Sequence, residues 1–115
     1  MRRFYSALSV LILASLPASA HHGWGSYDAA NPMTITAEIK QVSLGNPHGM
    51  MMLTHKGTAW EVTLAPLSRM RARGATAELL SVGKQVGAYG YPKRDGSPEM
   101  RAEWIEVDGK RIELR

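Results

Sequence analysis

Short segments in which apolar and polar residues alternate, separated by turn residues, constrain the fold of this chain more than any other feature. Residues 34–40 alternate with a period of two, and one face of this segment carries Ile35, Ala37 and Ile39. Val42 and Leu44 continue the alternation in the opposite phase. A change of phase inside one long strand predicts a bulge or bend, and Gly45-Asn46-Pro47 then ends the strand.

Four more strands, a short helix and a terminal hairpin follow from similar patterns. The strands are predicted over residues 48–55, 58–64, 85–92 and 99–107. Pro66 suits the first turn of a helix over residues 67–73, and Gly74 suits the position after its end. Asp108-Gly109 is a two-residue hairpin turn, which residues 111–114 close.

The alternation also assigns the faces of the strands. In residues 48–55 one face carries His48, Met50, Met52 and Thr54, and the other carries Gly49, Met51, Leu53 and His55. In the next strand Trp60, Val62 and Leu64 are expected to face the core, whereas Glu61 and Thr63 face water. Strand phasing places four aromatic residues mainly in the core, namely Trp60, Tyr89, Tyr91 and Trp104.

This order of elements predicts an all-β fold with a minor helix. The long bent first strand, the helix between the third and fourth strands and the glycine-rich fourth strand favour a small OB-like barrel. The barrel is expected to have five to six strands and to span residues 33–115. The alternative is an open β-meander or sandwich with one helix. Residues 21–32, which are rich in glycine, alanine and polar residues, are expected to form an N-terminal arm.

The first twenty residues have the three zones of a signal peptide. Arg2 and Arg3 precede the apolar run of residues 7–16, and Ala18-Ser19-Ala20 matches the small-residue cleavage pattern. The apolar run is about half the roughly 20 residues that a transmembrane helix needs, so residues 1–20 are predicted to be cleaved. A short membrane anchor or buried helix is the alternative. Cleavage predicts a periplasmic or secreted protein.

The composition excludes several kinds of site and partner. The chain has no cysteine, which excludes disulfides, zinc–thiolate sites, iron–sulfur clusters and thiol catalysis. Loss of Arg2 and Arg3 lowers the formal charge from +4 to +2, and this value, with export and no long basic run, argues against nucleic acid as a partner. No later apolar segment is long enough to span a bilayer, and no complete enzyme signature occurs.

Several motifs resemble those of a family of small secreted bacterial proteins of unknown function. The expected mature chain starts with His21-His22-Gly23-Trp24. Asn46-Pro47-His48 opens a strand and Gly90-Tyr91-Pro92 ends one, and both patterns are similar to those of the family. The resemblance covers essentially all of the mature chain. It implies export and a compact β-rich fold, and it supplies no catalytic residues.

The predicted cleavage point suggests a copper site. Cleavage after Ala20 would make His21 the N-terminal residue, whose amine and imidazole together can chelate a metal. A distant histidine would complete a nitrogen-rich set that suits Cu(II), and this arrangement resembles the histidine brace of copper proteins. We expect His48 to be that partner, because it follows a turn at a strand end, with His22 in support. His55 is the other available histidine.

The methionines near His48 support the copper hypothesis, but a purely structural role also explains these residues. Met50 and Met52 share a face with His48, and thioethers suit Cu(I). Against this, histidines after a signal peptide are often part of a solvated tail, and the run Met50-Met51-Met52 is typical of residues that fill irregular core space. Copper therefore stays the alternative interpretation, and a copper-dependent oxidative activity ranks last because no substrate surface is defined.

A binding module without metal is the main interpretation. Arg69 and Arg73 lie four residues apart and share a face of the short helix, where they would hold an anionic lipid, a polysaccharide or a protein. Trp24 and Tyr27, which could form an aromatic wall beside the copper site, are further candidate residues for binding a ligand or partner. A solvated helix face is the simpler explanation of the arginines. We therefore expect a small exported binding module of the bacterial cell envelope, whose partner is an envelope protein or a small ligand.

Overall fold

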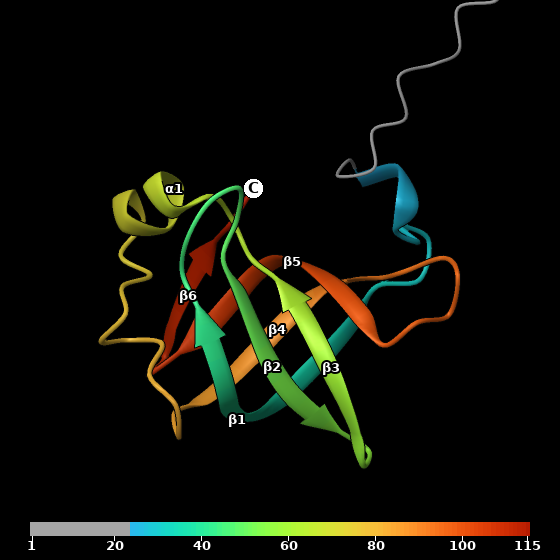
Figure 1. Ribbon diagram of the computed structural model, residues 1–115, viewed down its shortest axis with the longest axis horizontal. Coiled ribbons are helices and arrows are strands. Elements are labelled where there is room, and N and C mark those ends of the chain that lie inside the picture. Colours follow the sequence, from blue (N-terminus) through green and yellow to red (C-terminus); the bar gives the residue numbers. More distant parts are fainter. Residues whose placement is uncertain (1–23) are drawn as a thin grey trace, which may run out of the picture.

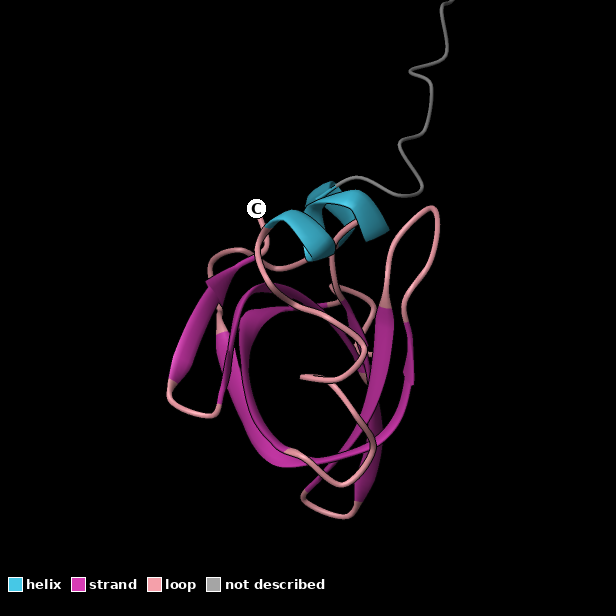
Figure 2. Cartoon of the chain, turned by 90° about the vertical axis from the view of Figure 1, so that its left-hand side faces the viewer, coloured by secondary structure: helices cyan, strands magenta, loops and turns pink. Residues whose placement is uncertain are grey.

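The computed structural model describes residues 24–115, which form a closed barrel with one additional strand (Figures 1 and 2). The strands are β1 (Met33–Ser43), β2 (Met50–His55), β3 (Thr58–Thr63), β4 (Gln85–Pro92), β5 (Glu99–Val107) and β6 (Lys110–Glu113). They pair in the order β3-β2-β1-β4-β5-β6, and a parallel pairing of β3 with β5 closes the barrel. This is the predicted OB-like fold. The predicted signal peptide, residues 1–20, lies outside the described residues.

The first strand, β1, pairs with two other strands, and its register shifts in the middle. Its first half pairs with β4 and its second half with β2. The register shifts between Ile39 and Gln41, at the place where the alternation changes phase. Ile35 and Ile39 are fully buried before the shift, and Val42 is partly buried after it. The predicted bulge is therefore confirmed, and it lets one strand bend around the barrel.

The third strand has the predicted inward face, and in the second strand the face with Met51 and Leu53 is the inward one, which the alternation alone had left open. Met51, Leu53 and Val62 are fully buried in the core. Thr63 differs from its expected exposure, because only 8% of it is accessible. It lies on the outer face between Met50 of β2 and Arg101 of β5, so barrel closure places it between two long side chains.

A short helix, α1 (Leu67–Ala72), follows β3 and places Met70 in the core. Full burial of such a side chain contributes about 2 kcal/mol to stability. Gly74 ends the helix with a φ of 82°, a conformation that glycine adopts without strain. Thr76 then caps the next turn, because its hydroxyl accepts a hydrogen bond from the Leu79 amide at 3.3 Å.

The described part of the N-terminal arm is attached to the loop between β4 and β5. It begins with a 3-10 turn, η1 (Trp24–Ser26), and lies beside that loop in Figure 1. Tyr27 forms a β-bridge with Lys93, and the Asp28 amide donates to the Pro92 carbonyl at 2.8 Å. The Arg94 guanidinium donates to two arm carbonyls, at 3.0 and 3.1 Å. These bonds fix the position of Trp24 relative to the barrel.

The pairing of β4 with β5 contains a second bulge. Tyr89 pairs with Trp104, but Gly90 pairs with Ala102, so Glu103 is an extra residue in β5. A Cβ on Gly90 would lie 2.0 Å from the Arg101 carbonyl oxygen, so only glycine fits here. The bulge allows Arg101 and Trp104, three positions apart, to lie on the same face of the sheet. Within residues 24–115, no helix is long and apolar enough to cross a membrane.

Candidate ligand-binding surface

Three of the four strand aromatics lie on the outer face of the barrel, which corrects the expectation that they fill the core. The inward positions of β4 are taken by small residues, Val86, Ala88 and Gly90, which are buried. Their neighbours Tyr89 and Tyr91 therefore point outward, and both are only partly buried. Trp104 of β5 is on the same face because it pairs with Tyr89. Trp60 does pack against the core, as expected.

The outer aromatic rings form a continuous row, defined here as Trp24, Tyr91, Tyr89 and Trp104. Tyr89 and Trp104 are stacked with their ring centroids 5.1 Å apart. Tyr91 meets Tyr89 edge to face at 6.2 Å, and Trp24 meets Tyr91 edge to face at 5.9 Å. The aromatic row therefore joins the arm to β4 and β5 across one surface.

Arginine guanidinium groups lie over the tryptophans at the two ends of this row. Those of Arg101 and Arg115 lie 4.2 and 4.5 Å from the centroid of the Trp24 ring. The guanidinium of Arg111 lies 4.2 Å from the Trp104 ring. Each distance is within the range of a cation–π interaction, which holds the flat guanidinium group in a fixed place. We call Trp24, Arg101 and Arg115 the arginine–tryptophan cluster.

Glu103, the bulge residue of β5, contacts one arginine of this cluster and the neighbouring Tyr91. Its carboxylate accepts a hydrogen bond from the Tyr91 hydroxyl and forms an ion pair with Arg115 at 3.4 Å. The hydrogen bond to Glu103, with burial as a lesser cause, raises the pKa of Tyr91 above its ordinary value of 10.0. The bulge thus places an acidic group where it orients one arginine and one tyrosine.

Electrostatics favour an anion at the cluster. Burial lowers the pKa of Arg101 from its ordinary value, Tyr27 opposes this change, and the positive charges of Arg115 and Arg69 add to the lowering. The positive charges of Arg115 and Arg69 are therefore close enough to disfavour the charge of Arg101. A carboxylate or phosphate placed among them would relieve this repulsion and could accept bidentate hydrogen bonds.

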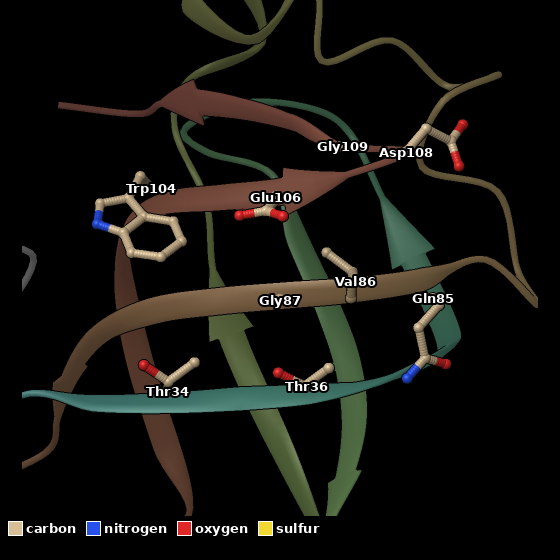
Figure 3. A pocket seen from close by; sticks show the side chains of 9 residues that line it. All are labelled: Thr34, Thr36, Gln85, Val86, Gly87, Trp104, Glu106, Asp108 and Gly109. Carbon is tan, nitrogen blue, oxygen red and sulfur yellow. The ribbon is translucent and has the colours of Figure 1, made fainter.

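An open groove of about 400 Å³ continues the surface beyond Trp104 (Figure 3). Gly87 forms its floor, between Thr36 of β1 and Glu106 of β5, and has no side chain to fill it. Figure 3 shows the six-membered ring of Trp104 turned toward Glu106. The other polar side chains around the groove are Thr34, Gln85 and Asp108. This part of the surface offers hydroxyl, amide and carboxylate groups to a ligand.

The sequence-predicted binding residues have different places in the structure. Trp24 is part of the arginine–tryptophan cluster, and Arg69 lies near enough to affect the charge of Arg101. Tyr27 is buried, with 8% of it accessible. Arg69 and Arg73 donate to the backbone carbonyls of Leu114 and Glu113, at 3.3 and 2.9 Å respectively. These two arginines thus attach α1 to the end of the chain.

The predicted metal ligands fall largely outside the structure. His21 and His22 lie outside the described residues. His48 precedes β2 and His55 ends it, so about 23 Å of extended chain separates them and they do not share an ion. In the described part of the chain, no group of three or more histidine or acidic residues is placed to hold a metal.

Sequence reasoning missed Arg101 and Arg115, which carry most of the charge of the surface. Arg101 lies in a strand whose change of phase at Trp104-Ile105 was not interpreted as a bulge, and Arg115 follows the last strand. Trp24 and the two arginines meet only in the folded chain. The other available signal was a group of three outer-face aromatics in a basic chain, Tyr89, Tyr91 and Trp104, which strand phasing assigned to the core.

Comparison with known proteins defines the family and the fold. The model of a family of unknown function, DUF6152, matches residues 9–101, about four fifths of the chain. No curated protein matches the sequence. The structure is similar to a chain in the crystal structure of the S. pombe Stn1-ten1 complex, with a TM-score of 0.53 and 17% identity. That match covers 66% of this chain and 57% of the other chain, so it supports the barrel fold alone.

Proposed function

The chain belongs to the DUF6152 family of unknown function, and from its own surface we propose that it is an exported binding module of the bacterial cell envelope for an anionic glycan. In this proposal the arginine–tryptophan cluster holds the acidic groups of the glycan. The groove at Gly87 receives its sugar rings and hydroxyl groups, and the aromatic row holds the arginines in place beside it. The protein is not an enzyme in this proposal.

The observation that carries the proposal is the pair of guanidinium groups over one indole ring. Arg101 and Arg115 lie 4.2 and 4.5 Å from the centroid of Trp24, so the ring limits the freedom of both side chains. An arginine that is held in place loses less entropy when it binds a carboxylate or phosphate. The ion pair of Arg115 with Glu103 is exposed on the arginine side and weak, so a ligand can replace it.

The groove supports a glycan rather than a bare anion. The side chains of Thr34, Thr36, Gln85 and Glu106 make no hydrogen bond within residues 24–115, and all four are exposed. They therefore present donors and acceptors to a ligand rich in hydroxyl groups. OB-fold barrels are known to accept oligosaccharides as well as oligonucleotides on their sheet surface.

The arrangement of the rings favours a glycan over a single-stranded nucleic acid. Stacking of bases requires free aromatic faces. Here guanidinium groups cover Trp24 and Trp104, and Tyr89 stacks on Trp104. The rings thus support arginines instead of offering faces to bases. Export, which the pattern of residues 1–20 predicts, also separates the protein from most nucleic acid.

Binding of defined oligomers to the mature chain, residues 21–115, tests this function. We expect saturable binding of an oligogalacturonate that weakens with added salt, and at least tenfold weaker binding of a neutral malto-oligosaccharide of equal length. Arg101→Gln with Arg115→Gln should reduce oligogalacturonate affinity at least tenfold. Lys40→Gln with Lys56→Gln removes the same charge from exposed positions elsewhere and should have little effect. Equal losses in both pairs, or tighter binding of oligothymidylate, would overturn the proposal.

Periplasmic copper binding through His21, with His22 and His48, remains the alternative function. It depends on an N-terminus at His21, which only the cleavage pattern supports. The structure adds one restriction: His48 and His55 lie at opposite ends of β2, so a brace can include one of them and not both.

A further inference from the structure

Two of the three consecutive methionines at the start of β2 lie outside the core. Met51 is fully buried and belongs to the core cluster. Met50 and Met52 point to the other face of the strand, and neither belongs to this cluster or packs against it. Core filling therefore explains Met51 and leaves the other two thioethers without that role.

The outward row of methionines extends by one residue to His48. The Gly49 amide donates to Ala65 and its carbonyl accepts from Leu64, both at 2.8 Å, so pairing with the chain after β3 continues past the end of β2. A Cβ on Gly49 would meet the Leu44 and Leu64 side chains at 3.2 and 3.5 Å, which shows that Gly49 faces inward. His48, the next residue in the alternation, thus takes an outward position.

The surroundings of Met50 and Met52 are polar, which makes apolar packing a poor explanation for them. Ser43 of β1 and Thr63 of β3 pair with Met50, and Gln41 and Glu61 pair with Met52. Figure 1 shows β2 between these two strands. Two partly buried methionine side chains thus lie on a sheet face whose paired neighbours carry hydroxyl, amide and carboxylate groups.

The imidazole of His48 has one ring nitrogen, Nε2, that can bind a metal ion. Its Nδ1 lies 3.1 Å from the Gly49 carbonyl oxygen. Since a carbonyl oxygen only accepts, Nδ1 carries the proton in this contact and Nε2 keeps a free lone pair. A hydrogen bond from the second nitrogen is the usual way in which a protein fixes the tautomer of a metal-binding histidine.

From this arrangement we propose that His48, Met50 and Met52 bind one soft monovalent cation, Cu(I) or Ag(I). Thioether sulfur and imidazole nitrogen are the ligands that Cu(I) prefers, whereas the nearby hydroxyl and carboxylate groups suit harder ions. Alternate residues of a strand lie about 6.8 Å apart, and methionine has three rotatable bonds, so both sulfur atoms can reach an ion between them.

This site is separate from the anionic-glycan surface, and it shares only His48 with the N-terminal copper brace. It lies on β2 and the preceding loop, whereas the arginine–tryptophan cluster joins the arm, β5 and the chain end. It uses neither the amine nor the imidazole of His21. It also takes the reduced ion, for which a brace of nitrogen ligands has less preference.

Competition for Cu(I) with bathocuproine disulfonate, without oxygen, tests the site. The mature chain carries His21→Gly and His22→Gly, so that the N-terminal chelate is removed. We expect one equivalent of Cu(I) to bind. Met50→Leu with Met52→Leu should weaken binding at least tenfold, and so should His48→Gln. Met51→Leu changes the buried neighbour and is the matched control, because leucine replaces methionine in cores at little cost.

A structural readout of the same variants completes the test. Ag(I) titration of protein with carbon-13-labelled methionine methyl groups should shift two resonances, and Met50→Leu and Met52→Leu should each remove one of them. No bound Cu(I), a loss of affinity in Met51→Leu equal to that of the double variant, or Ag(I) shifts of other methionines would overturn the proposal. Binding that persists in the double variant would overturn it as well.

Discussion

The guanidinium carbon of Arg101 lies 4.2 Å above the ring of Trp24, although Trp24 precedes the first strand and Arg101 lies on the fifth. This contact depends on two separate features. The bonds of Arg94 to the arm hold Trp24 in place, and Arg101 lies on the outer face of β5 between the buried Met100 and Ala102. The candidate surface is therefore a product of tertiary structure and not of any single segment.

Replacement of Trp24 tests the importance of this contact. Trp24→Leu keeps an apolar side chain but removes the ring on which Arg101 and Arg115 lie. Two cation–π contacts at a partly exposed site contribute about 1–2 kcal/mol together, so the free energy of unfolding in urea should fall by about that amount. Affinity for oligogalacturonate should fall about tenfold, because both guanidinium groups become mobile. Trp24→Phe keeps a ring, and an effect as large as that of Trp24→Leu would contradict this explanation.

Tyr91 should show a characteristic dependence on pH. Its hydrogen bond to Glu103 and, secondarily, burial raise its pKa above 10.0 in the folded state. A raised folded pKa means that the stabilisation is complete below the unfolded pKa, near 10, and is lost as the pH rises through the folded value. Ultraviolet titration should therefore show a tyrosine that ionises above pH 10, and Tyr91→Phe should remove that step.

The same variant measures the hydrogen bond itself. Loss of the Tyr91 hydroxyl should cost about 1 kcal/mol near neutral pH, and this difference between wild type and Tyr91→Phe should shrink above pH 10. A difference in unfolding free energy that is constant from pH 7 to pH 11 would show that Glu103 and Tyr91 are not coupled. Tyr89→Phe is the control, since its hydroxyl makes no hydrogen bond among the described residues.

Gly90 tests the bulge that orients the surface. A methyl group here would lie 2.0 Å from a backbone carbonyl oxygen, so β4 and β5 must separate to admit it. Gly90→Ala should therefore destabilise the fold by about 3 kcal/mol or more, measured by urea unfolding. Gly87→Ala is the matched control on the same strand, where the nearest atoms would lie 3.8 and 3.9 Å away. Similar losses in the two variants would contradict the close approach at Gly90.

The sequence predicted the fold well because its alternation separates the two faces of each strand. The change of phase after Ile39 predicted the bulge of β1, and the alternation separated Met51 and Leu53 from Met50 and Met52 without deciding which pair is buried. Successive side chains of a strand point to opposite faces, so an apolar residue at every second position indicates a strand with one buried face. Asp108 and Gly109, with φ values of 51° and 75°, adopt the hairpin turn that their residue types predict.

The candidate surface was less predictable for two physical reasons. The rings of Tyr89, Tyr91 and Trp104 were assigned to the core by strand phasing, yet the inward positions of β4 are taken by the small Ala88 and Gly90 beside them. The extra residue Glu103 changes the phase of β5, and the adjacent apolar pair Trp104-Ile105, which marks this change in the sequence, was not interpreted as a bulge. A surface built from a bulge and from distant segments is visible only in the folded chain.

The copper hypothesis for the N-terminus predicts that His21 is the first residue of the mature chain and that it binds Cu(II). Protein exported through its own signal and purified without a tag should have His21 as its first residue, which intact mass establishes. Electron paramagnetic resonance with one equivalent of Cu(II) at neutral pH should then show a nitrogen-rich signal, which changes in His48→Ala if His48 completes the brace. His55→Ala is the control, because His55 lies at the far end of β2 and packs against Trp60. A signal insensitive to His48→Ala would reduce the brace to a chelate of His21 and His22, and a mature chain that starts elsewhere would contradict it.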